Sequence, residues 1–256
     1  MEKKPLKADF YIQHLYIYVS EADRMALFSG FGFGHFLEAV DMPENLLLLK
    51  HPYEEASFNM HTHLDFATKE EYSQLKRARS NRKSEFCWVD FRSEKQLNSL
   101  TPQEQAELLY LGHKKEPVKS PFFTTLQNEY VYLAGEEKEW TKIYFRRMEK
   151  LGALIANHFT QIIRKETNGQ HFFRRRMKDL IPELPKEQFH KLRMDMGEGV
   201  LLSLADPEKT KNTIELHVRT VGEIDFMDEF WEDLGDTIRK PLSGRIVYDR
   251  KQKGWK

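Results

Sequence analysis

The stretch WTKIYFRRMEKLGALIANHFTQIIRK, residues 140–165, is the longest uninterrupted periodic segment of the chain. Its apolar side chains recur three and four residues apart, which is the spacing of one helix face. They are Trp140, Ile143, Tyr144, Leu151, Leu154, Ile155, Phe159, Ile162 and Ile163. The cationic side chains mostly off this stripe, which are expected to face water, are Lys142, Arg146, Arg147, Lys150, Arg164 and Lys165. The pattern predicts one helix over 139–165, about 40 Å long at ~1.5 Å per residue, as the centre of the fold.

Shorter patterns on both sides of this segment predict strands and further helices. The apolar or alternating runs that predict strands are 9–19, 45–50, 85–91, 130–133, 200–204, 213–219 and 245–248. Thr101-Pro102 followed by Glu104 is a capping box, which predicts a helix over about 102–111. Because strands and helices do not alternate regularly, we expect an α+β fold. Its mixed or antiparallel sheet would pack against the long central helix, with additional flanking helices.

The length of 256 residues is near the upper limit for one hydrophobic core. We therefore expect an N-terminal α/β lobe over residues 1–135. A second lobe, 136–256, would hold the long helix and a C-terminal α+β part. One continuous domain is the alternative.

Composition limits the classes of partner. Forty basic and forty acidic residues cancel, so only local patches can attract nucleic acid or an anionic surface. Cys87 is the single cysteine, which excludes an intramolecular disulfide and fits a reducing compartment. The chain shows no signal-peptide pattern and no apolar run approaching ~18 residues. We expect a soluble, cytoplasmic protein without a membrane partner.

The sharpest chemical motif is HTHLDF, residues 61–66. On a strand, side chains two residues apart point to the same side, so His61, His63 and Asp65 would converge on one ion. Imidazole and carboxylate groups are ligands of zinc and similar divalent metals. The alternative is a set of ordinary strand side chains, hydrogen-bonded or half exposed, and the sequence leaves both open.

The string HTHLDF resembles the opening strand of the amidohydrolase and TatD-type metal-dependent hydrolases. In those families the motif lies near the start of a β/α barrel, with further metal ligands at later strand ends. The resemblance implies a hydrolase that uses His61, His63 and Asp65. The candidates for a further ligand are His35, His113 and His158.

A second constellation is basic. The helix predicted over 170–180 has an apolar stripe and an opposite cationic one, which would bind phosphates through charge and guanidinium forks. The predicted phosphate or nucleic-acid contacts are His171, Arg174, Arg175 and Lys178, together with Arg164 and Lys165. An acidic helix predicted over about 226–238 provides the alternative, because the two charged helices could pair within the chain.

The leading functional hypothesis is a regulatory or adaptor protein that presents charged helical faces to a protein or nucleic-acid partner. This hypothesis needs no cofactor. The alternative is a hydrolase with a divalent metal such as zinc at His61, His63 and Asp65. No motif decides between an enzyme and a binding protein, and the sequence gives neither the partner nor the oligomeric state.

Overall fold

The structure is a computed structural model, which divides into two compact units. The described residues are 14–81, 84–135, 140–168, 181–185, 188, 191, 192, 194, 197, 199–220 and 241–256. The first unit comprises Met1–Ser20, Phe28–Gly30 and Leu151–Lys256, and the second comprises Glu21–Leu27 and Phe31–Lys150. The domain boundary predicted after residue 135 thus lies inside the second unit.

Antiparallel strands form the sheet of the second unit, in the order β8-β7-β6-β3-β5-β4. Their bounds are β3 (Asn45–Lys50), β4 (Ser57–Asn59), β5 (Leu64–Thr68), β6 (Phe86–Phe91), β7 (Tyr130–Ala134) and β8 (Thr141–Phe145). All residues of β6 and β7 are buried, which explains why both strands are continuously apolar in sequence apart from Asp90. A further strand, β2 (Met25–Ser29), has residues in both units.

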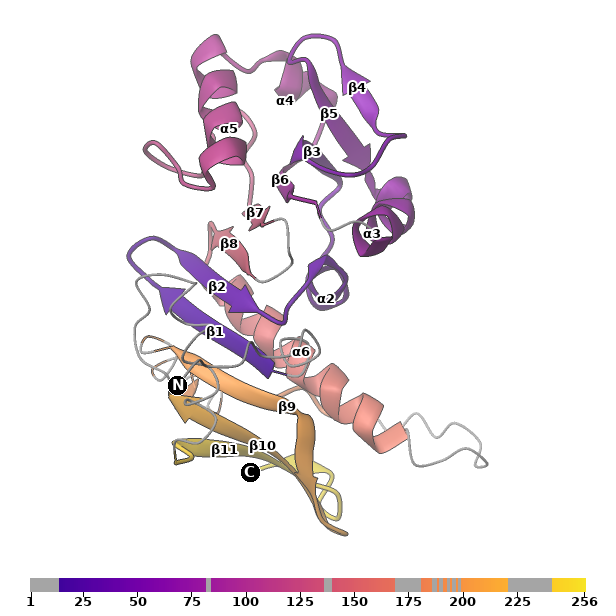
Figure 1. The fold of residues 1–256 in the computed structure, drawn as a ribbon, viewed down its shortest axis with the longest axis vertical. Helices are drawn as coiled ribbons and strands as arrows, with labels where there is room; N and C mark the ends of the chain where they lie inside the picture. Colours follow the sequence, from indigo (N-terminus) through magenta and orange to yellow (C-terminus); the bar gives the residue numbers. More distant parts are fainter. Residues whose placement is uncertain are drawn as a thin grey trace, which may run out of the picture. The chain divides into compact units, whose positions relative to one another are not determined.

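Helices cover both faces of this sheet (Figure 1). They are α2 (Phe33–Ala39), the 3-10 helix η1 (Lys69–Glu71), α3 (Tyr72–Asn81), α4 (Glu94–Asn98) and α5 (Pro102–Lys114). On one face Phe36 of α2 packs edge-on against Trp88, at 5.3 Å between ring centroids. On the other face Leu108 and Leu111 of α5 join the core that contains Val89. The alternation of side chains along β6 therefore supplies two hydrophobic layers.

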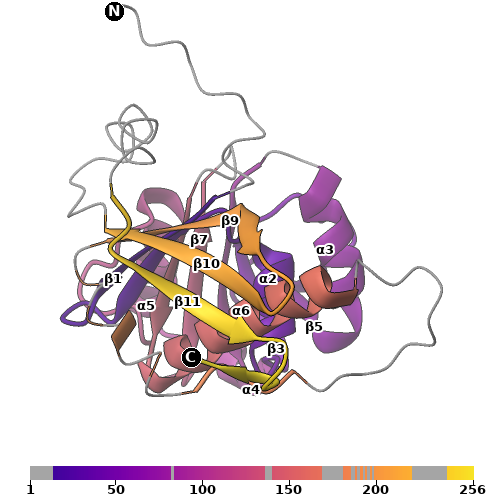
Figure 2. The ribbon, with the colours of Figure 1, turned by 90° about the horizontal axis from the view of Figure 1, so that it is seen from below.

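The sheet of the first unit is built from both ends of the chain. Its strands follow the order β12-β11-β10-β9-β1 and pair antiparallel. Their bounds are β1 (His14–Ser20), β9 (Val200–Lys209), β10 (Thr213–Thr220), β11 (Gly244–Asp249) and β12 (Gly254–Trp255). Ile214, Leu216 and Val218 of β10 are buried, whereas the residues between them are partly exposed, as their alternation predicts. Figure 2 shows β9, β10 and β11 side by side.

The helix α6 (Glu149–Asn168), which belongs to the first unit from Leu151 onward, supplies a further apolar layer there. Ile155, Phe159 and Ile163 are buried and recur every four residues, which places them on one helix face. This part of the predicted apolar stripe thus belongs to a helix.

The prediction of one long central helix over residues 139–165 is wrong. Residues 141–145 form β8, which pairs with β7 from Tyr130 opposite Phe145 to Ala134 opposite Thr141. The helix begins only at Glu149. Backbone hydrogen bonds to β7 and burial of Ile143 and Phe145 outweigh the local helical pattern. The fold is therefore α+β, dominated by antiparallel strands rather than by a central helix.

Within the described ranges, no helix is both long enough and apolar enough to cross a membrane.

Candidate functional site

The second unit contains a cavity of about 660 Å³ beside β8. Three segments line it: the turn before β2 with the first residue of that strand, the loop after α5, and β8. Its charged side chains are Asp23, Arg24, Glu116, Lys119 and Lys142. Because three are cationic and two are acidic, the cavity has a small formal excess of positive charge.

The strand β8 positions Lys142 and Tyr144 at this cavity. The two residues lie two apart on the strand, so their side chains leave it on the same side. Lys142 is half-buried, and its Nζ donates a hydrogen bond of 3.4 Å to the carbonyl of Lys115. The Lys142 amine therefore lies at the wall of the cavity, and its main-chain acceptor, Lys115, is not one of the residues that line the cavity.

The C-terminal end of α5 sets the direction of the loop that follows it. Lys115 takes a left-handed conformation with φ 58°, and its N–H donates to the carbonyl of Leu111, 2.8 Å away. Its side chain forms an ion pair with Glu85. Pro117 and Pro121 then keep the chain out of regular structure along the cavity.

The turn before β2 is joined directly to β8. The carbonyl of Arg24 accepts a hydrogen bond of 2.9 Å from the N–H of Phe145. Arg24 itself has φ 53°, a left-handed conformation that closes the turn with a bond from its N–H to the carbonyl of Glu21. The backbone that carries the Arg24 guanidinium is thereby fixed next to the strand that carries Lys142.

The electrostatic environment of the cavity acts on Lys142 and Tyr144. Burial lowers the pKa of the Lys142 amine, and this effect exceeds the opposing influence of Glu116 and Asp23. Burial, with the same two carboxylates, raises the pKa of Tyr144 to about 12. At neutral pH the tyrosine therefore keeps its proton, while the lysine loses its proton more readily than a lysine in water.

No ion pair joins Arg24, Lys119 or Lys142 to a carboxylate in the part of the chain that the structure describes. Arg24 and Lys119 line the cavity and are exposed to solvent. Their charges are therefore available to a ligand, in contrast to those of Lys115 and Arg147, which pair with Glu85 and Glu129.

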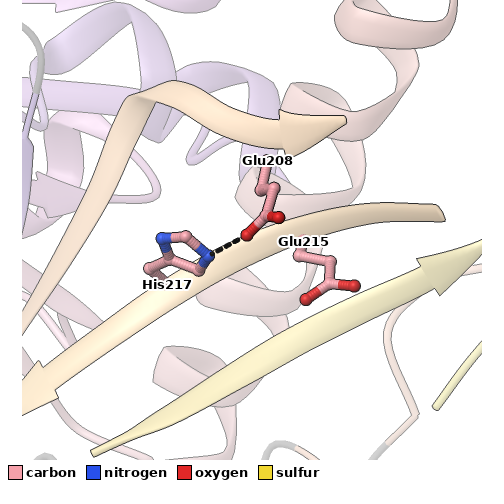
Figure 3. Close-up of side chains that lie close together, drawn as sticks. All are labelled: Glu208, Glu215 and His217. Atoms are coloured by element: carbon pink, nitrogen blue, oxygen red, sulfur yellow. Dashed lines mark hydrogen bonds and ion pairs between the residues drawn. The ribbon is translucent and has the colours of Figure 1, made fainter. Parts of the chain in front are cut away.

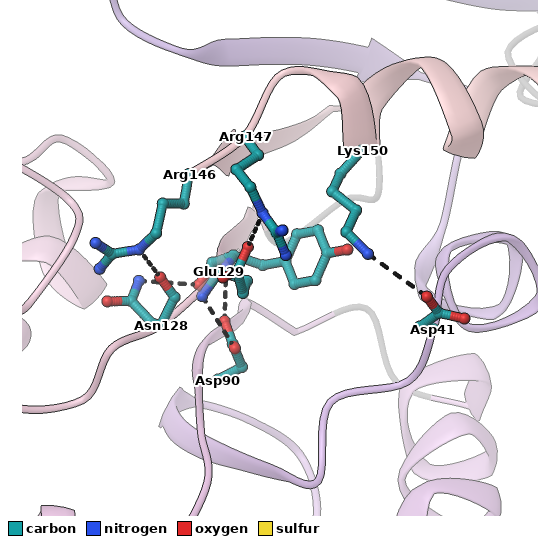
Figure 4. A network of polar contacts seen from close by, with 8 residues as sticks. Asp41, Asp90, Asn128, Glu129, Arg146, Arg147 and Lys150 are labelled. Carbon is teal, nitrogen blue, oxygen red and sulfur yellow. Dashed lines mark hydrogen bonds and ion pairs between the residues drawn. The ribbon is translucent and has the colours of Figure 1, made fainter.

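A polar network supports the aromatic wall of the cavity (Figure 4). Arg146 donates from Nε to the carbonyl of Asn128, 2.6 Å away, and its guanidinium lies 5.2 Å from the ring centre of Phe122, which lines the cavity. The carboxylate of Asp90 accepts hydrogen bonds from the N–H groups of Glu129 and Tyr130, at 3.1 and 2.6 Å. The network thus fixes the backbone between the cavity loop and β7.

Sequence reasoning missed the cavity because it assigned Lys142 to the solvent side of a helix. A short alternation in TKIYF, residues 141–145, where Lys142 and Tyr144 fall between Thr141, Ile143 and Phe145, points to the site but is too brief to outweigh the helical pattern. Period-two alternation places the lysine on a strand face instead of a helix surface.

The structure places His61 and His63 in the turn between β4 and β5, and both are exposed. The side-chain oxygen of Asn59 accepts a hydrogen bond of 3.1 Å from the N–H of His61, and His63 has φ 55°. The predicted convergence of the imidazoles requires residues 61–63 to form a strand. In the structure these residues form a turn. β4 and β5 form an antiparallel hairpin around the turn.

Asp65 lies on β5 and pairs with another histidine. Its Oδ2 is 3.0 Å from Nε2 of His51, which the sequence analysis did not single out. Of the other candidate ligands, His35 accepts a hydrogen bond from the N–H of Gly32, and His158 is buried on α6 of the first unit. Metal binding at His61, His63 and Asp65 remains a prediction.

Most of the predicted basic cluster lies outside the described residues. This applies to His171, Arg174, Arg175 and Lys178, to the side chain of Lys165 and to the predicted acidic helix over 226–238. Arg164 is described, and its Nη2 donates a hydrogen bond of 3.1 Å to the carbonyl of Ile181. Phosphate or nucleic-acid contact by this cluster remains a prediction.

Another group of potential metal ligands lies in the first unit (Figure 3). Among the residues with described side chains, Glu208, Glu215 and His217 bring one ligand atom each within 4.8 Å of the others. The donor types suit a divalent metal. However, Glu208 is 3.2 Å from Nε2 of His217, and Glu215 is 3.0 Å from Nη1 of Arg245. These contacts between neighbouring strands account for the grouping without an ion.

Comparisons with protein-family models, with curated proteins and with solved structures give no match.

Proposed function

We propose that the chain is a binding protein and that the cavity beside β8 binds a small ligand bearing a phosphate or a carboxylate. The observation that carries this proposal is the convergence of Arg24, Lys119 and Lys142 on one cavity without a carboxylate partner among the described residues. A cation that faces a cavity without an ion pair favours an anionic occupant, because the ligand then supplies the missing charge.

The dimensions of the cavity fit a small molecule. Ligand cavities commonly measure ~300–1,000 Å³, and the predominantly polar lining of this one suits a charged ligand. Here Met25, Phe122 and Tyr144 supply the apolar surface. The cationic groups would orient the anionic end of the ligand, and the aromatic side chains would contact its body.

This proposal differs from the function predicted from the sequence, in which a regulatory or adaptor protein presents charged helical faces to a protein or nucleic-acid partner. In a regulatory or adaptor protein, binding of the ligand in the cavity would change the affinity of the chain for its partner. The partner, whether protein or nucleic acid, and the cytoplasmic location remain predictions.

The experiment is isothermal titration calorimetry at low ionic strength with pyrophosphate and with citrate, which separate a phosphate site from a carboxylate site. We expect one of the two to bind the unmodified protein, and its affinity to fall as salt is added. In Lys119→Glu the affinity should fall at least about tenfold, since the change replaces an attraction with a repulsion.

Lys95→Glu is the matched control, because Lys95 is an exposed lysine on α4 outside the cavity lining. Its affinity should equal that of the unmodified protein. No binding of either anion, or equal loss in Lys95→Glu and Lys119→Glu, would overturn the proposal.

A further inference from the structure

The amine of Lys142 differs chemically from the other cationic groups of the cavity. Arg24 has a guanidinium, which does not act as a nucleophile at neutral pH, and Lys119 is exposed to water. Lys142 is half-buried on a strand, so its position at the cavity wall is fixed by the sheet. A lysine in such a setting can attack a carbonyl carbon, provided that its amine is uncharged.

The contacts of Lys142 leave its amine open to a ligand. Within the described residues its Nζ has one hydrogen bond, at the long distance of 3.4 Å, to the carbonyl of Lys115. An uncharged amine has two N–H donors and a lone pair. One donor can stay on this carbonyl while the lone pair is directed to the cavity.

From this geometry we propose that Lys142 forms an imine with a small aldehyde or ketone that bears a phosphate or a carboxylate. This inference rests on the proposed function, because Arg24 and Lys119 of the same cavity hold the anionic end of the molecule while Lys142 supplies the amine. It adds the chemical class of the ligand: an anionic carbonyl compound.

The reaction balances without an oxidant or a reductant. The lone pair of Nζ forms a bond to the carbonyl carbon, and the carbonyl oxygen takes a proton from the amine, giving a carbinolamine. The second amine proton then leaves with the hydroxyl group as one molecule of water, and a carbon–nitrogen double bond forms. Hydrolysis reverses both steps.

Neighbouring groups at the cavity suit these proton transfers. Tyr144 leaves β8 on the same side as Lys142 and keeps its proton at neutral pH, so it can donate a hydrogen bond to the carbonyl oxygen. Glu116 also lines the cavity and can accept a proton. The lowered pKa of Lys142 increases the uncharged fraction of its amine over that of an exposed lysine.

The test uses pyridoxal 5′-phosphate as a probe that has both an aldehyde and a phosphate. The 256-residue chain is treated with a limiting amount of the probe, the imine is reduced with borohydride, and the modified lysine is located by peptide mass spectrometry. We expect severalfold higher modification at Lys142 than at Lys95. Pyridoxal, which lacks the phosphate, should lose most of this preference.

Two variants separate this inference from the proposed function. Lys142→Arg keeps the positive charge, so it should still bind the anion found by calorimetry but should form no adduct at position 142. Lys95→Arg should leave modification of Lys142 unchanged. If the anion binds and the probe modifies Lys142 no more than Lys95, imine formation is wrong and anion binding stands. If no anion binds, both proposals fail.

Discussion

Asn59 is the residue that determines the conformation of the HTH turn. Its side-chain oxygen accepts hydrogen bonds from the N–H groups of His61 and Thr62, at 3.1 and 2.9 Å, and its amide donates to Asn98. Asparagine commonly closes such turns by bonding to the backbone two residues on. The local signal was therefore present in FNMHTHL, residues 58–64, but the alternating histidines suggested a strand.

Asn59→Ala is expected to lower the free energy of unfolding by about 1–3 kcal/mol, since it leaves the buried N–H of Thr62 without its acceptor. His61→Ala is the control within the same turn and should change it by less than about 0.5 kcal/mol, because His61 is exposed. Urea denaturation monitored by tryptophan fluorescence measures both. Equal effects of the two substitutions would contradict the assigned turn.

Asp90 gives a pH dependence that can be measured. Burial raises its pKa from 3.8 to about 6, although two backbone N–H groups donate to the carboxylate. Because the folded pKa lies above the unfolded one, the native state binds the proton more tightly. The free energy of unfolding therefore falls as pH rises from about 4 to about 6, by up to about 3 kcal/mol in total.

The variant Asp90→Asn isolates this contribution, because it has no titrating group at the position. The unfolding free energy of the unmodified protein minus that of Asp90→Asn should decrease between about pH 4 and about pH 7. Urea denaturation of both proteins across this window measures the difference. A difference that is constant would show an unshifted Asp90 pKa, and a difference that rises with pH would show a lowered one; either result would contradict the effect of burial.

The helices and strands that were predictable from the sequence are those whose signal lies in their own residues or in the adjoining cap. The capping box of α5 is present: Thr101 Oγ1 accepts from the N–H of Glu104 at 3.2 Å, and Glu104 accepts from the N–H of Thr101 at 2.9 Å. The alternation of residues 213–219 likewise gives β10. In both cases the deciding interactions lie within the segment itself.

The segment 140–165 was not predictable in the same way. Trp140, Ile143 and Tyr144 fit a helical stripe, and the five residues of β8 are too few for alternation to stand out. The state of β8 depends on its partner β7, which ends seven residues earlier at Ala134. The candidate cavity was missed for the same reason. The side chain of Lys142 reaches the cavity only because residues 141–145 form a strand.

Removal of the α5 cap is expected to destabilise the second unit. Thr101→Ala should lower the free energy of unfolding by about 1 kcal/mol, because the N–H of Glu104 loses its acceptor. Thr124→Ala is a matched control at an exposed threonine outside the helix and should have no comparable effect. Urea midpoints of the two variants test this, and a loss no larger than the control's would count against the cap.

At the scale of the whole molecule, the two units differ in how the chain forms them. The first unit needs β1 from the N-terminal region and β9 to β12 from the C-terminal region. The second unit lies within one continuous stretch, residues 21–150, apart from Phe28–Gly30. Its sheet from β8 to β4 and its hydrophobic core are both inside this stretch.

The fragment 21–150 is therefore expected to fold alone, with a cooperative unfolding transition and the Lys142 cavity intact. Circular dichroism during thermal unfolding, together with calorimetry using the anion that binds the full chain, measures both properties. A fragment of 151–256 lacks β1 and should not show a comparable transition. Absence of a cooperative transition in 21–150 would contradict the assignment of an independent core.

The most direct test of the cavity as an anion site is an NMR pH titration of Lys142 in protein with labelled lysine side chains, assigned with Lys142→Arg. We predict that the Lys142 amine titrates at lower pH than the exposed lysines. The anion identified by calorimetry should move this titration to higher pH, because a nearby negative charge favours the protonated amine. A Lys142 amine that titrates with the exposed lysines and does not respond to either anion would contradict the account.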